Sequence, residues 1–214
     1  AMDECLRQWV ARHYADLPSL PVVKGPVMVH HVPRFLSMRR GAGETKIALL
    51  VFDGLAIDQW VQIREALAKR APKLGFEEGA CFAWLPTLTS VSRQALFSGL
   101  KPRDFADTIE STSPEPAQWS RFWQDQGLRA NEVLYRKGIK RNDQLDDLDA
   151  ALSHPALKVA QSFLEGLTSF GGELAEIARE TSQPRAAGNT CAPIHRRTFS
   201  ASYAFVAFWH RSAR

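Results

Sequence analysis

The chain has 214 residues, of which 45% are hydrophobic and 23% are charged, a mix typical of a globular domain with a substantial core. No apolar run approaches the ~20 residues that a membrane-spanning helix needs, and residues 1–17 carry acidic side chains where a secretion signal has an apolar centre. The three cysteines, Cys5, Cys81 and Cys191, are isolated from one another. This spacing argues against a disulfide framework or a thiolate zinc site and favours the cytoplasm.

The net charge of +4 comes from the C-terminal end of the chain. Residues 181–214 contain five arginines and no acidic residue, so the rest of the chain keeps 22 of the 27 basic side chains against 23 acidic ones. A basic tail can bind nucleic acid, but a solvated, unstructured end is the simpler interpretation. The near-neutral body predicts little sequence-independent binding of nucleic acid.

The N-terminal part is predicted to contain one helix followed by an arm. Residues 3–16 place Leu6 and Val10 on one apolar face of a helix. Several prolines then end the pattern, and the following short apolar pieces predict a strand or a packing arm. Adjacent side chains in a strand point to opposite faces, so we expect one of His30 and His31 to be packed and the other exposed, and not a metal-binding pair.

Two strand–helix pairs are predicted next. Residues 47–52 form a continuous apolar run typical of a central strand covered on both faces, and a helix follows over about 59–70. Residues 79–85 form a second apolar run, followed by a helix over about 90–97 that Gly99 ends. This order predicts an α/β domain with a parallel sheet. Ligands bind such sheets beyond the carboxyl ends of the strands.

The later part of the chain is less regular. A helix is predicted over 116–127, with inward Trp119, Phe122 and Trp123, followed by a strand within 128–136. A short acidic helix is predicted over 145–152. Its aspartates are too crowded to bind one ion together, so a solvated helix face is expected.

Polar side chains fall at the expected carboxyl ends of both strands. Asp53 and Gly54 follow the first strand, where the carboxylate can bind a cation, although an Asp-Gly pair is more often only a turn. Thr87, Thr89 and Ser90 precede the second helix. Unpaired N–H groups and the helix dipole there would stabilise an alkoxide and a phosphoryl group, and a nearby metal would activate the hydroxyl. The residues alone favour the alternative, that one of these hydroxyls is only the N-cap.

Two motifs at this separation resemble the PglZ domain of BREX-type phage-defence systems, a member of the alkaline phosphatase superfamily. They are VFDGLAIDQW at 51–60 and LPTLTSVSRQALFSG at 85–99, and VHHVPRFLS at 29–37 is also similar. The resemblance covers about residues 25–160. It implies a three-layer α/β fold around a mostly parallel sheet, and a metal-dependent phosphohydrolase or phosphodiesterase with two metals, usually zinc. It also implies other phage-defence proteins as partners and a phosphate ester or nucleic acid as substrate.

The resemblance also implies roles for individual residues. By position in the motifs, Asp53 matches the first metal-ligand aspartate. Thr89 matches the nucleophile that bridges the metals and forms a phosphothreonine intermediate, and Thr87 fits that role less well. Ser92 or Arg93 falls where members of the superfamily often have a phosphate-binding residue.

The chain departs from the superfamily pattern downstream. The remaining metal ligands should be an Asp with a His a few residues later, then an Asp-His pair, then a further His. No Asp follows Asp149, and His195 and His210 lie in sequence that does not resemble the family. We therefore expect a domain that is incomplete on its C-terminal side, truncated or out of frame after about residue 160, with weak or no activity. The alternative function is a non-catalytic module that docks with other defence proteins or nucleic acid.

These observations predict three parts of the chain. Residues 1–45 form an N-terminal helix and arm, 46–160 form the first part of the alkaline-phosphatase-like domain, and 161–214 form a divergent basic tail.

Overall fold

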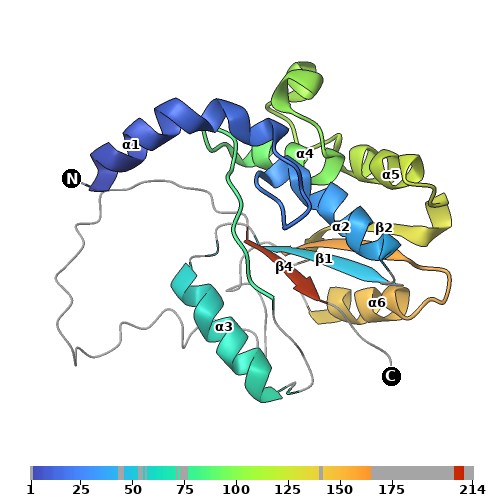
Figure 1. The fold of residues 1–214 in the computed structure, drawn as a ribbon. Helices are drawn as coiled ribbons and strands as arrows, with labels where there is room; N and C mark the ends of the chain where they lie inside the picture. The colour runs from blue at the N-terminus through green and yellow to red at the C-terminus, as the bar shows by residue number, and fades with distance from the viewer. Residues whose placement is uncertain are drawn as a thin grey trace. The chain divides into compact units, whose positions relative to one another are not determined.

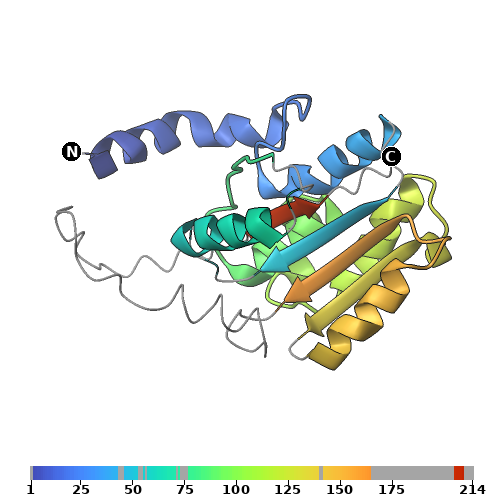
Figure 2. The same cartoon turned by 90° about the horizontal axis from the view of Figure 1, so that it is seen from below.

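The structure is a computed structural model that describes residues 2–42, 46–52, 55, 57–70, 72, 77–139, 142–164 and 205–209 (Figure 1). Its sheet contains β1 (Ile47–Phe52), β2 (Val133–Ile139), β3 (Val159–Leu164) and β4 (Phe205–Trp209). The strand order is β2-β3-β1-β4 (Figure 2). β1, β2 and β3 are parallel, and β4 pairs with β1 in the antiparallel direction. The predicted α/β class with a mostly parallel sheet is confirmed.

β4 is a departure from the predicted unstructured tail. Its register places Phe205 opposite Phe52 and Trp209 opposite Ala48, so it pairs along nearly the whole length of β1. An apolar run of this kind satisfies its backbone groups by joining a sheet edge. Local sequence patterns contain no information on a pairing partner more than 150 residues away, which is why this strand was missed. The helix considered for residues 171–180 lies outside the described residues.

The chain divides into two compact units, which are described separately. The first comprises Ala1–Ile47, Phe76–Tyr135 and Ala156–Ala160, and the second comprises Ala48–Gly75, Arg136–Pro155 and Gln161–Arg214. The three parts expected from the sequence stay a prediction.

The first unit is mainly helical. It contains α1 (Met2–His13), η1 (Tyr14–Ser19), η2 (Val29–His31), α2 (Val32–Gly41), α4 (Thr89–Ser98), η3 (Pro102–Thr108), α5 (Glu115–Asp125) and η4 (Ala130–Glu132), where η marks a 3-10 helix. Of the two alternatives for the segment after the first helix, a strand or a packing arm, the strand is wrong, because η2 and α2 occupy residues 29–41. Pro33 lies in the first turn of α2, where its fixed φ favours a helix start, and Val32 and Leu36 are buried.

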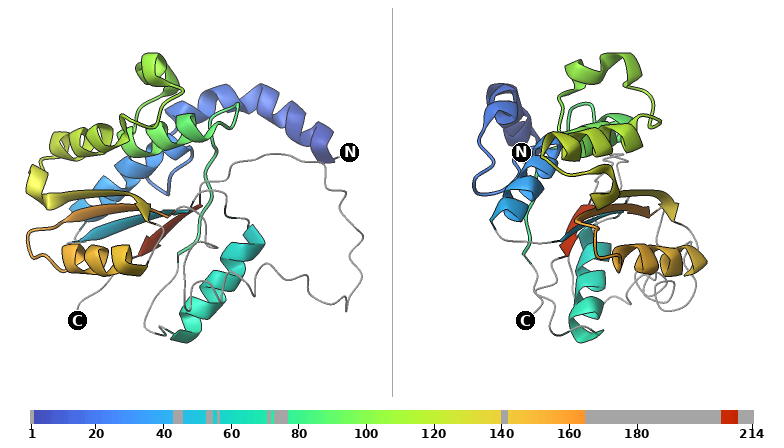
Figure 3. Two further views of the ribbon diagram at one scale, coloured as in Figure 1. Left: turned by 180° about the vertical axis from the view of Figure 1, so that it is seen from behind. Right: turned by 90° about the vertical axis from the view of Figure 1, so that its right-hand side faces the viewer.

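The core of the first unit is built around α4. Every residue from Val91 to Ser98 is buried, and the helix packs against α5 (Figure 3). The inward orientation predicted for the aromatic residues of α5 is confirmed, since Trp119, Phe122 and Trp123 are all buried. Gly99 follows α4 with φ of +68°, as predicted for a helix-ending glycine.

The second predicted strand, residues 79–85, is wrong. This run is extended, but its pairing is a single parallel bridge between Phe82 and Met28, and it is not one of the four strands of the sheet within the described residues. Phe82 stacks on Trp9 with 5.5 Å between ring centroids, and the ring of Trp84 lies 5.1 Å from that of His30, while Leu85 is exposed. Composition indicated an extended apolar segment correctly but could not indicate its partner.

The second unit contains α3 (Ile57–Arg70) and α6 (Asn142–Leu152). Leu55 and Ile63 are buried together, and Phe52, Trp60, Ala66 and Leu67 pack against them. Both helices were predicted, with ends a few residues away. Within the described ranges, no helix is long and apolar enough to cross a membrane.

Candidate active site

The candidate nucleophile lies at the N-terminus of α4. The N-cap is Leu88, which has an extended backbone (φ −95°, ψ 136°) and makes no capping hydrogen bond with its side chain. Thr89 is the first helical residue and is half-buried. The alternative that Thr87, Thr89 or Ser90 is the N-cap is therefore wrong. The first N–H groups of a helix have no partner within the helix, so the hydroxyl of Thr89 lies at the positive end of the helix dipole.

The segment that leads into α4 is held by the N-terminal part of the chain. The hydroxyl of Tyr14 donates a hydrogen bond to the carbonyl oxygen of Ala83 (2.6 Å) and accepts one from the N–H of Leu85 (2.9 Å). The backbone of Phe82 forms two more hydrogen bonds, of 2.8 and 2.9 Å, with residues 27 and 29. The Leu85–Pro86 peptide is cis. These contacts set the direction from which the chain enters the helix.

Ser92 and Arg93, the candidate phosphate-binding residues, are both buried. The Ser92 hydroxyl has no hydrogen-bond partner in the part of the chain that the structure describes. The guanidinium of Arg93 donates from Nε and from Nη2 to the two carboxylate oxygens of Glu115, each at 2.6 Å. Glu115 is fully buried and also accepts a hydrogen bond from the Tyr135 hydroxyl at 2.6 Å.

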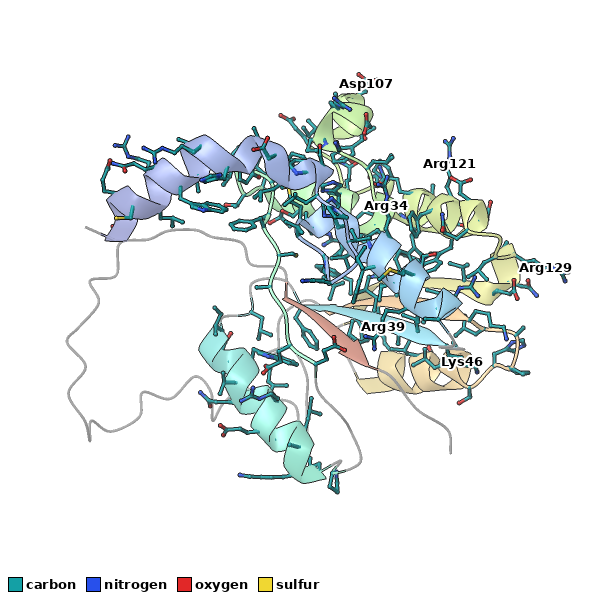
Figure 4. The ribbon with its side chains drawn as sticks, viewed as in Figure 1. Arg34, Arg39, Lys46, Asp107, Arg121 and Arg129 are labelled. Carbon is teal, nitrogen blue, oxygen red and sulfur yellow. The ribbon has the colours of Figure 1, made fainter. Side chains whose placement is uncertain are left out.

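Arg93 is buried, whereas Arg121 and Arg129 are exposed and point outward (Figure 4). Burial lowers the pKa of Arg93, but the hydrogen bonds and charge of Glu115 outweigh this effect and leave the pKa raised. Removing the guanidinium would leave a buried carboxylate without its cation, at a cost of about 3–5 kcal/mol. A phosphate contact from Arg93 stays a prediction, and it requires the guanidinium to leave or share Glu115.

Sequence reasoning missed Glu115 and Tyr135. Burial, followed by the hydrogen bond to Glu115, raises the pKa of Tyr135, so the phenol stays protonated and acts as a donor. Glu115 is 22 residues from Arg93, at the start of α5. Their pairing depends on how α5 packs against α4, which no local pattern in the sequence indicates.

His30 and His31 are both buried, so the expectation that one of them is exposed is wrong. They lie in η2, which packs against α4, and their ring centroids are 4.1 Å apart. His31 accepts a hydrogen bond at Nδ1 from the N–H of Met28 (3.2 Å). Burial first, and then the charge of His31, lowers the pKa of His30 to about 4, so this ring is neutral at physiological pH.

A metal centre is not assembled within the described residues. No group of three or more His, Cys, Asp or Glu side chains there could hold a metal ion. Asp53 lies outside the described residues, so the structure does not place it. The residues that are described fit a nucleophile position but do not fit a metal centre, and the roles of Asp53 and Thr89 as metal ligands stay predictions.

A mostly parallel α/β sheet is consistent with an alkaline-phosphatase-like protein. The family model described as BREX system PglZ alkaline phosphatase-like domain matches residues 34–152, more than half of the chain. The chain belongs to the PglZ family, which confirms the resemblance seen in the sequence. No curated protein matches the chain. Membership implies a role in BREX-type defence, association with defence-system proteins, and a superfamily that generally depends on divalent metals.

Proposed function

We propose that this chain carries the nucleophile-bearing part of a PglZ-type phosphohydrolase or phosphodiesterase that acts in BREX-type phage defence. The observation that carries the proposal is the position of Thr89. It is the half-buried first residue of a helix that is buried from Val91 onward, and it lies within the family match. The hydroxyl is therefore at a helix N-terminus, where phosphate groups are stabilised.

The proposed reaction is attack by the Thr89 hydroxyl on the phosphorus of a phosphate ester. The hydroxyl loses its proton as its oxygen bonds to phosphorus, and the ester oxygen leaves as the alcohol. Water then releases the phosphate from the threonine. Unpaired N–H groups of the first turn stabilise the phosphoryl oxygens. Ser92, whose hydroxyl has no partner within the described residues, is the candidate for a further phosphate contact. The guanidinium of Arg93, the other candidate from the motif, is already paired with Glu115.

The metal part of the proposal rests on sequence resemblance alone. Asp53 and Thr89 are proposed as ligands and zinc as the metal, but no step of the reaction is assigned to it. The sequence has no Asp after Asp149, so the aspartate ligands that the superfamily carries downstream are not in this chain. We therefore propose that the chain by itself has little or no turnover.

The alternative is a non-catalytic module that docks with other defence proteins or nucleic acid. The same lack of downstream aspartates favours it. A cytoplasmic location is part of both proposals and is supported by the isolated cysteines.

The proposal is tested by zinc content after purification and by hydrolysis of p-nitrophenyl phosphate and bis-p-nitrophenyl phosphate on the same sample. Thr89→Ala is the test variant, and Thr87→Ala is the matched control two residues away. We expect less than one zinc per chain and turnover close to background. Near-stoichiometric zinc, with turnover lost only in Thr89→Ala, would confirm the nucleophile but refute the incomplete ligand set. Turnover that survives Thr89→Ala would refute the nucleophile.

A further inference from the structure

A set of buried polar contacts joins α4 to α5 and to the start of β2 inside the first unit. Arg93 of α4 makes two hydrogen bonds to Glu115 of α5, and Tyr135 of β2 makes a third. All three distances are 2.6 Å. The aromatic ring of Phe97 also meets the ring of Tyr135 edge-on, with 5.6 Å between centroids. The contacts therefore connect three elements that are distant in the sequence.

Arg93, Glu115 and Tyr135 together form the first polar anchor of α4, a buried group of contacts that holds the helix against α5 and β2. The side chain of Glu115 is fully buried, and that of Arg93 is 8% exposed. Both carboxylate oxygens accept hydrogen bonds from the Arg93 guanidinium, so this guanidinium is committed to a buried anion inside the unit. A bidentate arginine–carboxylate pair fixes orientation as well as distance. Arg93 lies four residues after Thr89, about one helical turn. The anchor therefore acts on the helix one turn from its N-terminus.

A second polar anchor lies next to the first. Gln94 donates to the carbonyl oxygen of Thr108 (2.6 Å) and accepts from the Thr108 hydroxyl and from Gln118 (both 2.9 Å). Consecutive residues of α4 are thus held by different partners, Arg93 by α5 and Gln94 by both η3 and α5. Together they restrict rotation of the helix about its axis as well as movement along it.

We propose that Arg93, Glu115 and Tyr135 are positioning residues that fix the first turn of α4, and with it the hydroxyl of Thr89, without touching the substrate. The catalytic meaning of this inference rests on the proposed function of Thr89. The structural part stands on the contacts alone: loss of the buried carboxylate loosens the first turn of α4 more than the rest of the helix.

Amide hydrogen exchange of the full chain, followed by NMR under native conditions, tests this inference. The reporters are Ser92, whose N–H donates to Leu88 at 2.9 Å, and Arg93, compared with Leu96 and Phe97 further along α4. We expect Glu115→Gln to raise exchange at the two early amides about tenfold, relative to the two later ones. Tyr135→Phe removes one donor while keeping the ion pair, so we expect a smaller rise of about threefold, which guards against a Glu115→Gln variant that fails to fold.

Glu110→Gln is the matched control, because it is the same substitution at an exposed residue, and it should change none of these rates. A uniform rise across α4, or unchanged early amides in both test variants, would overturn the inference. Thr89→Ala should leave the exchange pattern unchanged. Turnover that survives Thr89→Ala, together with the expected exchange pattern, would refute the proposed function and leave the anchor intact.

Discussion

The hydroxyl of Tyr14 is predicted to contribute to the stability of the folded chain through two hydrogen bonds with the segment that leads into α4. Tyr14→Phe keeps the ring but removes one hydrogen bond to Ala83 and one from Leu85. An intramolecular hydrogen bond contributes about 0.5–1.5 kcal/mol net, so the two together are worth about 1–3 kcal/mol. Burial raises the pKa of Tyr14, so the hydroxyl stays protonated at neutral pH and the loss applies there in full.

Urea unfolding, monitored by tryptophan fluorescence, measures this loss, because Trp84 lies between the two residues that Tyr14 binds. We expect the free energy of unfolding to fall by the stated amount in Tyr14→Phe, and to fall further in Tyr14→Leu, which also loses the packing of the ring. Amide exchange at Leu85 should rise in both variants. A Tyr14→Phe variant with wild-type stability and unchanged exchange at Leu85 would refute the claim that the Tyr14 hydroxyl holds this segment in place.

Three further predictions concern stability. The pKa of His30 is about 4 in the folded chain, against an ordinary value of 6.5. Between pH 6.5 and pH 4, His30 is protonated in the unfolded chain but neutral in the folded one. Its contribution to the free energy of unfolding is therefore fully present above pH 6.5 and is lost as the pH falls toward 4, by up to about 3 kcal/mol. His30→Phe should reduce the pH dependence of the urea-unfolding midpoint across that range. An unchanged pH dependence would contradict the lowered pKa of His30. Gly99→Ala should destabilise by about 1–2 kcal/mol, because its φ is +68° and an added Cβ would lie 3.2 Å from Phe122. Gly41→Ala, where no atom lies within 4 Å of an added Cβ, is the control that should not destabilise. Arg39→Ala should change stability by less than about 0.5 kcal/mol in the same assay, because its ion pair with Glu77 is solvent-exposed. A loss above about 1 kcal/mol would contradict this prediction.

The elements that the sequence predicted well are those with a strong local signal. The continuous apolar run of β1, the glycine that ends α4 and the inward tryptophans of α5 follow from periodicity and turn chemistry. The family was also accessible, because two motifs with fixed separation carry it.

The elements that were missed depend on contacts between distant residues. Residues 79–85 looked like a sheet strand because composition does not say which backbone an extended run pairs with. β4 was missed for the same reason. The pairing of Arg93 with Glu115 was missed because it depends on the packing of α5 against α4, and the phosphate contact of Arg93 stays a prediction. The N-cap alternative failed because the N-cap position falls on Leu88, between the two threonines.

The central claim is that Asp53 and Thr89 are what this chain retains of a PglZ metal and nucleophile site. Zinc titration by calorimetry tests it most directly, with Asp53→Asn and Thr89→Ala beside Asp107→Asn, an exposed aspartate in η3. The account predicts weak zinc binding that falls at least about tenfold in Asp53→Asn and also weakens in Thr89→Ala, with Asp107→Asn unchanged. Zinc affinity that is the same in all four proteins, or no binding in any of them, would contradict the claim.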